Sequence, residues 1–403
     1  MTPNLLAKYI ARHSYDIRRS KNGRWIDQKC AFDNLCFVSD CIVEYLRNGG
    51  AQPFSSPDIW KSQYAVNNVQ AWFGKPDPLQ KSTMDEYNKF YRQPKKLLAA
   101  AGVLEERKIG GKIEFRVANI DILEYIAQRE RNSFDFLCQY IEKTLLDSGL
   151  SDSFESFFDM QDKDHLQIAK KKFVQFCIDN TPINTEIEAN RIFIKVLNPL
   201  ACKYHKKGIV KGRVSTDMIT FDKIVYNQPN WRDIRAGKNK NVSRGDYDPT
   251  EKNKTLHKYK VSRASKNLRR FNDNFNNKKS EVLDKYSVGR EATHMHHIFP
   301  QSQFPEIADS IENLIALTTA QHMQCAHPDG NTQVVDKDYQ YICLINKVES
   351  IRKNTINNQG EPIIYDFKEF MSILDIGFKT SYFCNLKEDD FESILKGIEV
   401  QFS

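Results

Sequence analysis

The histidines of this chain are concentrated in one short stretch. Five of the nine fall within 34 residues: His294, His296, His297, His322 and His327. Imidazole is the side chain best suited both to bind a transition metal and to move a proton near neutral pH. Successive side chains of a strand point to opposite faces, so the adjacent histidines cannot both face one way on an extended strand. We therefore expect a bend or strand end there, which would let one histidine hold a metal while its neighbour reaches a water molecule.

The histidine pair belongs to a longer pattern. Residues 294–300 read HMHHIFP, residues 312–314 read ENL, and Asn313 is followed nine residues later by His322. This pattern resembles the HNH motif of ββα-metal nucleases, in which a histidine pair on a hairpin strand, a loop asparagine and a helical histidine form the active site. Coincidence of the pair, the amide and the later histidine at this spacing is much less common than any single histidine.

The resemblance implies a role for each matching residue. His296 and His322 would hold one divalent cation, and His297 would be the general base. Asn313 would tie the loop so that His297 points at the attacking water. His294 falls where many members of the family carry a glutamate near the metal, so it is an additional candidate.

The role of a fifth histidine, His327, depends on the helix predicted to precede it. That helix begins near Thr318 or Thr319 and ends before Pro328, which cannot continue it well. On an α-helix His322 and His327, five residues apart, do not share a face. We therefore expect His327 to cap or pack, and a further metal ligand is the alternative.

The chain departs from the family pattern in one respect. Many HNH domains carry two CxxC pairs for a structural zinc, one of them just before the last histidine. Residues 318–322 read TTAQH here, and the nine cysteines form no CxxC pair. Cys325 alone cannot rebuild a site that needs about four nitrogen or sulfur ligands. The resemblance thus implies one divalent metal ion per active site, Mg²⁺ first and Mn²⁺ second, and no structural zinc.

The stretch from residue 292 onward is similar in particular to a group of Type II HNH restriction endonucleases. This implies a site-specific double-stranded DNA endonuclease that leaves 5′-phosphate ends and has a companion DNA methyltransferase. A symmetric target would call for a homodimer. The alternatives are a non-catalytic DNA-binding or regulatory protein with a vestigial HNH motif, and an HNH homing endonuclease. Pro76-Asp77 with Glu106-Arg107-Lys108 loosely fits the PD…(D/E)xK pattern of another nuclease class, a pattern common by chance.

Composition excludes some other classes. The chain is 40% hydrophobic and 28% charged, as in ordinary globular proteins. No apolar run approaches the length of a membrane span, and the first 19 residues contain no long apolar region typical of a signal peptide. The scattered cysteines are expected to be reduced thiols. We expect a cytoplasmic protein with no membrane partner.

Basic residues gather just before the histidine cluster. Residues 201–280 contain 21 Lys/Arg against 7 Asp/Glu, although the net charge of the whole chain is only +7. Such a surface neutralises phosphates and releases counterions, the main source of non-specific DNA affinity. A solvated face without a partner is the alternative. Beside the HNH-like motif we predict contacts to double-stranded DNA from Lys258, Lys260, Arg263, Lys266, Arg269 and Arg270.

Residues 83–117 predict a second DNA-binding element. A helix is followed by Pro94, which starts or kinks a second short helix over 95–101. Strand-like runs over 103–109 and 112–117 then flank a Gly-Gly pair, which favours a hairpin. Helices followed by a basic hairpin suggest a winged helix, and a purely structural module is the alternative. The contact candidates are Lys95, Lys96, Arg107, Lys108 and Lys112.

These patterns predict an α+β chain in three parts. Residues 1–150 would form a mixed α/β DNA-recognition region with the winged-helix-like segment. Residues 151–200 carry apolar side chains at helical spacing and would form a helical middle region. Residues 201–403 would hold the basic segment and a ββα-metal HNH nuclease domain with its motif at 294–327. Further helices are expected over 339–353 and 366–375.

Overall fold

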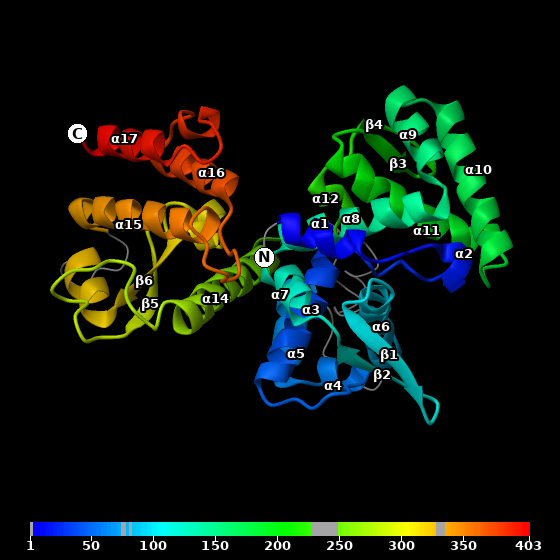
Figure 1. Ribbon diagram of the computed structural model, residues 1–403, viewed down its shortest axis with the longest axis horizontal. Helices are drawn as coiled ribbons and strands as arrows, with labels where there is room; N and C mark the ends of the chain where they lie inside the picture. Colours follow the sequence, from blue (N-terminus) through cyan, green and yellow to red (C-terminus); the bar gives the residue numbers. More distant parts are fainter. Residues whose placement is uncertain (1–2, 74–77, 80–82, 227–248, 328–334) are drawn as a thin grey trace, which may run out of the picture. The chain divides into compact units, whose positions relative to one another are not determined.

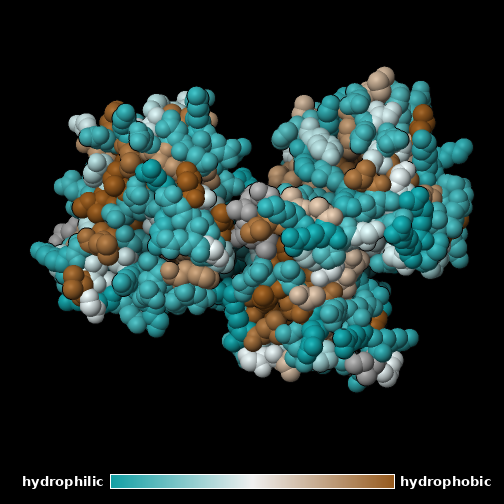
Figure 2. Space-filling view, viewed as in Figure 1, coloured by the Kyte–Doolittle hydropathy of each residue, from teal (hydrophilic) through white to brown (hydrophobic). Residues whose placement is uncertain are grey.

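The computed structural model describes residues 3–73, 78–79, 83–226, 249–327 and 335–403. They belong to two compact units, an amino-terminal unit, Pro3–Lys252, and a carboxy-terminal unit, Asn253–Ser403. Helices dominate both units, and the described strands form three two-stranded antiparallel sheets (Figure 1). The predicted α+β class is confirmed. Most of the surface visible in Figure 2 is hydrophilic, because the apolar residues are collected in the cores.

In the part of the amino-terminal unit that the structure describes, helices are combined with two hairpins. Its helices are α1 (Pro3–Ala11), α2 (Ile17–Ser20), α3 (Phe32–Arg47), α4 (Ser56–Trp60), α5 (Gln63–Phe73), α6 (Met84–Ala100), α7 (Ile120–Gln128), α8 (Glu130–Ser148), α9 (Ser151–Met160), α10 (Lys163–Asn180), α11 (Glu186–Lys203) and α12 (Phe221–Ile224). Its strands are β1 (Leu104–Ile109), β2 (Lys112–Val117), β3 (Lys207–Val210) and β4 (Arg213–Met218).

The predicted hairpin after α6 is confirmed. Strands β1 and β2 pair from Leu104↔Val117 to Ile109↔Lys112. The two turn glycines between them have positive φ, a conformation that glycine adopts without steric cost. Phe54, between α3 and α4, forms an isolated antiparallel bridge with Phe115 of β2. Along the chain the order is α3, the Phe54 bridge, α4, α5, α6 and then the hairpin β1–β2.

The prediction of two short helices around Pro94 is wrong, because α6 runs through it without a break. Proline has no N–H to donate to the carbonyl four residues earlier, which here belongs to Phe90. The amide nitrogen of Asn34 donates to that carbonyl at 3.3 Å. A buried side chain from α3 thus satisfies the group that the proline leaves without its helical partner.

The amino-terminal unit extends to Lys252 and so includes the hairpin β3–β4. Hairpin β3–β4 packs on α11, and the Asn198 side chain binds both backbone groups of Ile209, at 2.8 and 2.9 Å. A hairpin of four and six residues is too small to be stable alone, so it stays with the helices that cover it.

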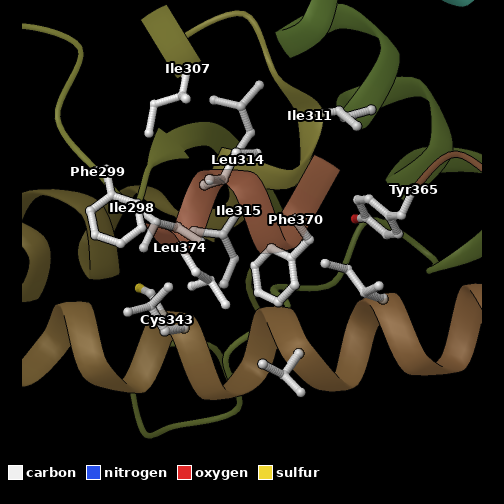
Figure 3. Packing of buried hydrophobic residues seen from close by; sticks show 14 of the residues in the cluster. Ile298, Phe299, Ile307, Ile311, Leu314, Ile315, Cys343, Tyr365, Phe370 and Leu374 are labelled. Carbon is white, nitrogen blue, oxygen red and sulfur yellow. The ribbon is translucent and has the colours of Figure 1, made fainter. Parts of the chain in front are cut away.

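The described residues of the carboxy-terminal unit form one hairpin and several helices. Helix α14 (Pro249–Phe275) leads into it, followed by β5 (Ala292–His297), η2 (Pro305–Ile307), η3 (Ile311–Asn313), β6 (Leu314–Thr318), the π-helix η4 (Gln321–Ala326), α15 (Lys337–Thr355), α16 (Phe367–Phe378), η6 (Phe383–Asn385) and α17 (Phe391–Phe402). The helices expected over 339–353 and 366–375 are confirmed as α15 and α16. Figure 3 shows Leu314 and Ile315 of β6 packed among Cys343 of α15 and Phe370 and Leu374 of α16.

A buried ion pair fixes the hairpin to these helices. Lys347 of α15 is fully buried, and its Nζ lies 2.7 Å from Glu281 and 2.9 Å from the Tyr365 hydroxyl. The other carboxylate oxygen of Glu281 accepts from the backbone N–H of Ala316 in β6 at 2.8 Å. Each charge is therefore matched by a partner, and the pair sets the position of β6 relative to α15. No helix among the described residues is apolar enough over a sufficient length to cross a membrane.

Candidate metal centre and active site

The hairpin β5–β6 carries the histidine pair at the end of a strand. His296 pairs with Ile315 and His297 with Leu314, and the chain bends directly after His297. Strand β6 is buried along its whole length, which fixes the register of β5 against the core. The strand end after His297 agrees with the expectation that the two adjacent imidazoles take different directions.

Three imidazoles from the two ends of the motif meet in one cluster. One ring nitrogen each of His296, His322 and His327 lies within 4.8 Å of the others. His296 and His327 are buried, with 3% and 4% of their surface exposed. Nε2 of His296 and Nδ1 of His322 are buried and have no hydrogen-bond partner among the described residues. Buried nitrogens without a donor or acceptor are costly, and their convergence fits a bound metal ion.

The structure brings His327 into the cluster, against the expectation that it only caps or packs. That expectation assumed an α-helix, but residues 321–326 form a π-helix in which the His327 N–H donates to the His322 carbonyl at 3.2 Å. In a π-helix residues five apart are bonded neighbours, so the two rings lie 4.7 Å apart. Gln321 anchors this turn: its amide accepts from Thr318 N and donates to the Val282 carbonyl.

The electrostatics of the cluster keep the imidazoles of His296 and His322 neutral. Burial, and then the neighbouring histidines, hold the pKa of His296 well below its usual value. Burial, His294 and His327 lower the pKa of His322 to about 4. Neutral imidazole is the form that binds a metal, so His296 and His322 can bind a cation without losing protons first.

His294 lies beside the cluster but not in it. Its ring stacks on that of His322, with the centroids 4.6 Å apart. Its Nδ1 lies 3.1 Å from the Thr293 hydroxyl and 3.5 Å from that of Thr319. A ring held by two hydroxyls and a stacking contact can orient His322.

His297 and Asn313 are linked through the loop that joins the two strands. Nε2 of His297 lies 3.0 Å from the Ala308 carbonyl, which can only accept, so the ring proton is on Nε2 and Nδ1 has a free lone pair. Asn313 is fully buried and binds both backbone groups of Phe299, at 2.9 and 3.0 Å, and the Ile307 carbonyl at 3.3 Å. Asn313 thereby closes the loop that presents Ala308 to His297.

A cavity of about 530 Å³ opens over these residues. His296, His297, His322 and His327 line it, and so does His257 of α14. Burial lowers the pKa of His297, the Ala308 hydrogen bond opposes this, and His257 lowers it further. The sequence patterns missed His257, because it lies 37 residues before His294 and outside any motif.

The predicted contact residues of α14 divide into two sets. Lys258, Lys266 and Arg269 are exposed, Lys260 and Arg270 are half-buried, and Arg269 donates to the Thr293 carbonyl at the start of β5. Arg263 is only 7% exposed and lies over the Tyr259 ring, so its burial contradicts the prediction that it contacts DNA. Its position among the core-facing residues of an amphipathic helix explains the difference.

The predicted contact residues of α6 and its hairpin also divide. Lys108 and Lys112 are exposed, and so is Arg107, which pairs with Glu105; half-buried Lys96 pairs with Glu106. Lys95 is fully buried between the rings of Phe54 and Phe115, which contradicts its predicted DNA contact. The exposed side of α6 instead carries Lys89 and Arg92 in helical register with Lys96. That spacing was readable from the sequence and was missed.

The rival PD…(D/E)xK pattern has no site that can be described, because Pro76-Asp77 lies outside the described residues. Its Glu106 forms an ion pair with Lys96.

Comparison of the chain with protein-family models, with curated proteins and with solved structures gives no match.

Proposed function

We propose that this chain is a metal-dependent endonuclease that cuts double-stranded DNA at specific sites, as Type II HNH restriction enzymes do. One observation carries the proposal. A cluster of three imidazole nitrogens within 4.8 Å of one another shares a cavity with a fourth imidazole, His297, whose Nδ1 is unprotonated. A metal site beside a positioned base is the arrangement that metal-assisted phosphodiester hydrolysis needs.

His296, His322 and His327 are the residues that would hold the metal ion. When bound, the ion supplies Lewis acidity to the phosphate and stabilises the charge that develops on the leaving 3′-oxygen. Three imidazoles are a donor set that suits first-row transition metals, whereas Mg²⁺ prefers oxygen ligands. The donor set therefore moves the proposal from Mg²⁺ toward Mn²⁺ or a similar ion.

The chain's own residues supply the base. Nδ1 of His297 accepts the proton of the attacking water, while the Ala308 carbonyl holds Nε2–H and keeps the ring in this tautomer. Burial, which lowers the pKa of His297, keeps it unprotonated before the reaction. Asn313 acts at a distance, because its contacts with Phe299 and Ile307 fix the loop that carries Ala308.

DNA recognition is assigned to the amino-terminal unit. The order α3, the Phe54 bridge, α4, α5, α6 and then hairpin β1–β2 supports a winged helix in this proposal. In this proposal α6 enters the major groove with Lys89, Arg92 and Lys96, and the hairpin lies against the backbone. Exposed lysines and arginines of α14 would bind phosphates near the cut. A companion methyltransferase, a homodimer on symmetric sites and action in the cytoplasm belong to the same proposal.

The test is digestion of unmodified phage DNA by the full-length protein with Mn²⁺ or Mg²⁺, followed by sequencing of the ends. We expect discrete fragments with 5′-phosphates and a shared short sequence, and no cutting in EDTA. His297→Ala should abolish cutting and leave DNA binding intact. The control His165→Ala, which changes a histidine of α10 outside the cluster, should alter neither. A smear would contradict site specificity. No cutting with any divalent metal would favour the regulatory alternative.

A further inference from the structure

The cavity that contains the metal-site histidines has a second polar side that the proposed mechanism leaves unused. It is formed by His257, from the first part of α14, and by Gln301 and Ser302, from the loop after β5. His257 and Gln301 are 44 residues apart in sequence and meet only through the fold. Both line the cavity that also holds His296 and His297.

The contact between these two residues indicates which of their atoms donate hydrogen bonds. Nε2 of Gln301 lies 3.1 Å from Nε2 of His257. An amide nitrogen can only donate, so the imidazole accepts at Nε2 and carries its own proton on Nδ1. The cavity side therefore offers a ring N–H, the second N–H of the amide and the Ser302 hydroxyl.

The rest of the lining indicates the charge of the ligand. Apart from the histidines, Gln301 and Ser302, the lining residues are apolar: Met295, Pro300, Pro305 and Val335. Among the described residues that line the cavity there is no carboxylate to repel an anion. There is no lysine or arginine among them either, so an anion would be bound there by N–H and O–H donors, together with the metal ion when it is present. A volume of about 530 Å³ is sufficient for a phosphodiester with part of its sugars.

We propose that His257 and Gln301 form a phosphate subsite, in which they bind a non-bridging oxygen of a DNA phosphate inside the catalytic cavity. This rests on the proposed nuclease function, and it makes His257 a substrate-positioning residue. Immediately after His257, α14 continues with exposed Lys258, and Lys266 follows two turns later. In this proposal the helix leads from a half-buried phosphate contact at His257 to exposed ones.

The test uses the full-length protein in EDTA, with the dinucleotide TpT as the probe and thymidine, which has no phosphate, as its control. The ring resonances of His257 are followed by NMR in ¹³C-histidine-labelled protein and are assigned by their loss in His257→Gln. TpT should shift them and thymidine should not. His257→Leu should weaken TpT binding about tenfold, as expected for one hydrogen bond to a charged group. His257→Gln, which keeps an N–H donor, should recover part of the loss, and Ser262→Ala, on an exposed position of the same helix, should bind like wild type.

A kinetic measurement separates this subsite from the nuclease proposal. In DNA cleavage, His257→Leu should raise KM with kcat nearly unchanged, because the contact is made in both the ground and the transition state. An unmoved His257 resonance at saturating TpT, or equal binding by His257→Leu and Ser262→Ala, would overturn the subsite. If TpT shifts His257 but wild type cuts no DNA, the subsite stands and the nuclease proposal fails.

Discussion

Lys95 is the buried cation whose energetic effect can be worked out most directly. Its side chain is fully buried in α6, with Nζ 4.8 Å from the centroid of the Phe115 ring and 5.8 Å from that of Phe54. Nζ has no hydrogen-bond partner among the described residues. Burial lowers the pKa of Lys95 to about 7; Asp58 opposes the shift and Arg92 adds to it. We predict that Lys95→Met stabilises the amino-terminal unit at neutral and acidic pH.

The magnitude follows from the difference between the folded and unfolded pKa values. The pKa of Lys95 is near 10.5 in the unfolded chain and about 7 in the folded chain. This difference corresponds to a destabilisation of the folded state below pH 7 by at most about 5 kcal/mol. Between these values the unfolded state binds the proton and the folded state does not. The free energy of unfolding of wild type therefore rises with pH through this window, and below pH 7 this contribution is constant. Methionine at this position removes the dependence.

The assay is urea unfolding of wild type and variant between pH 6 and pH 10, followed by tryptophan fluorescence. Trp25, Trp60 and Trp72 belong to the amino-terminal unit, and residues 253–403 contain no tryptophan, so the signal does not report the carboxy-terminal unit. Lys95→Met should be the more stable protein by several kcal/mol at pH 6, with the difference shrinking toward pH 10. Lys96→Met, at the half-buried neighbour, should follow the wild-type pH curve. Equal pH dependence of Lys95→Met and wild type would refute the reasoning.

Three further predictions concern the site and the DNA surface. Asn313→Ala removes the side-chain partners of the Phe299 backbone groups and should destabilise the carboxy-terminal unit by about 2–4 kcal/mol. The loss should appear as faster amide hydrogen exchange in the loop, and unchanged exchange would show that Asn313 does not hold the loop. His327→Ala should weaken Mn²⁺ or Co²⁺ binding at least about tenfold by calorimetry, and an unchanged affinity would exclude His327 as a ligand. Arg92→Ala should weaken DNA binding and lower its salt slope by about one, whereas a variant at Lys95 should leave that slope unchanged.

Local patterns were sufficient to locate the hairpin β1–β2 and the core of the candidate site, whereas the hairpin β3–β4 was not predicted. The Gly-Gly pair at 110–111 and the alternating runs beside it predicted β1 and β2, because turn chemistry acts over a few residues. The histidine pair, the asparagine and the later histidine indicated which side chains would gather, and the structure brings His296 and His322 together with Asn313 closing the loop. Helices α15 and α16 were also expected from the sequence.

Other features depended on contacts between segments far apart in sequence. The π-turn that brings His327 to His322 is held by Gln321 bonding to Val282, and a sequence pattern does not contain that long-range contact. Lys95 and Arg263 looked like DNA contacts because basic residues are usually solvated, yet helix packing buried both. His257 reaches the cavity only because α14 lies beside the loop after β5. The sequence by itself determined the local elements and the residue types of the site; the tertiary structure decided which side chains are buried and which meet, because burial depends on what packs against each face.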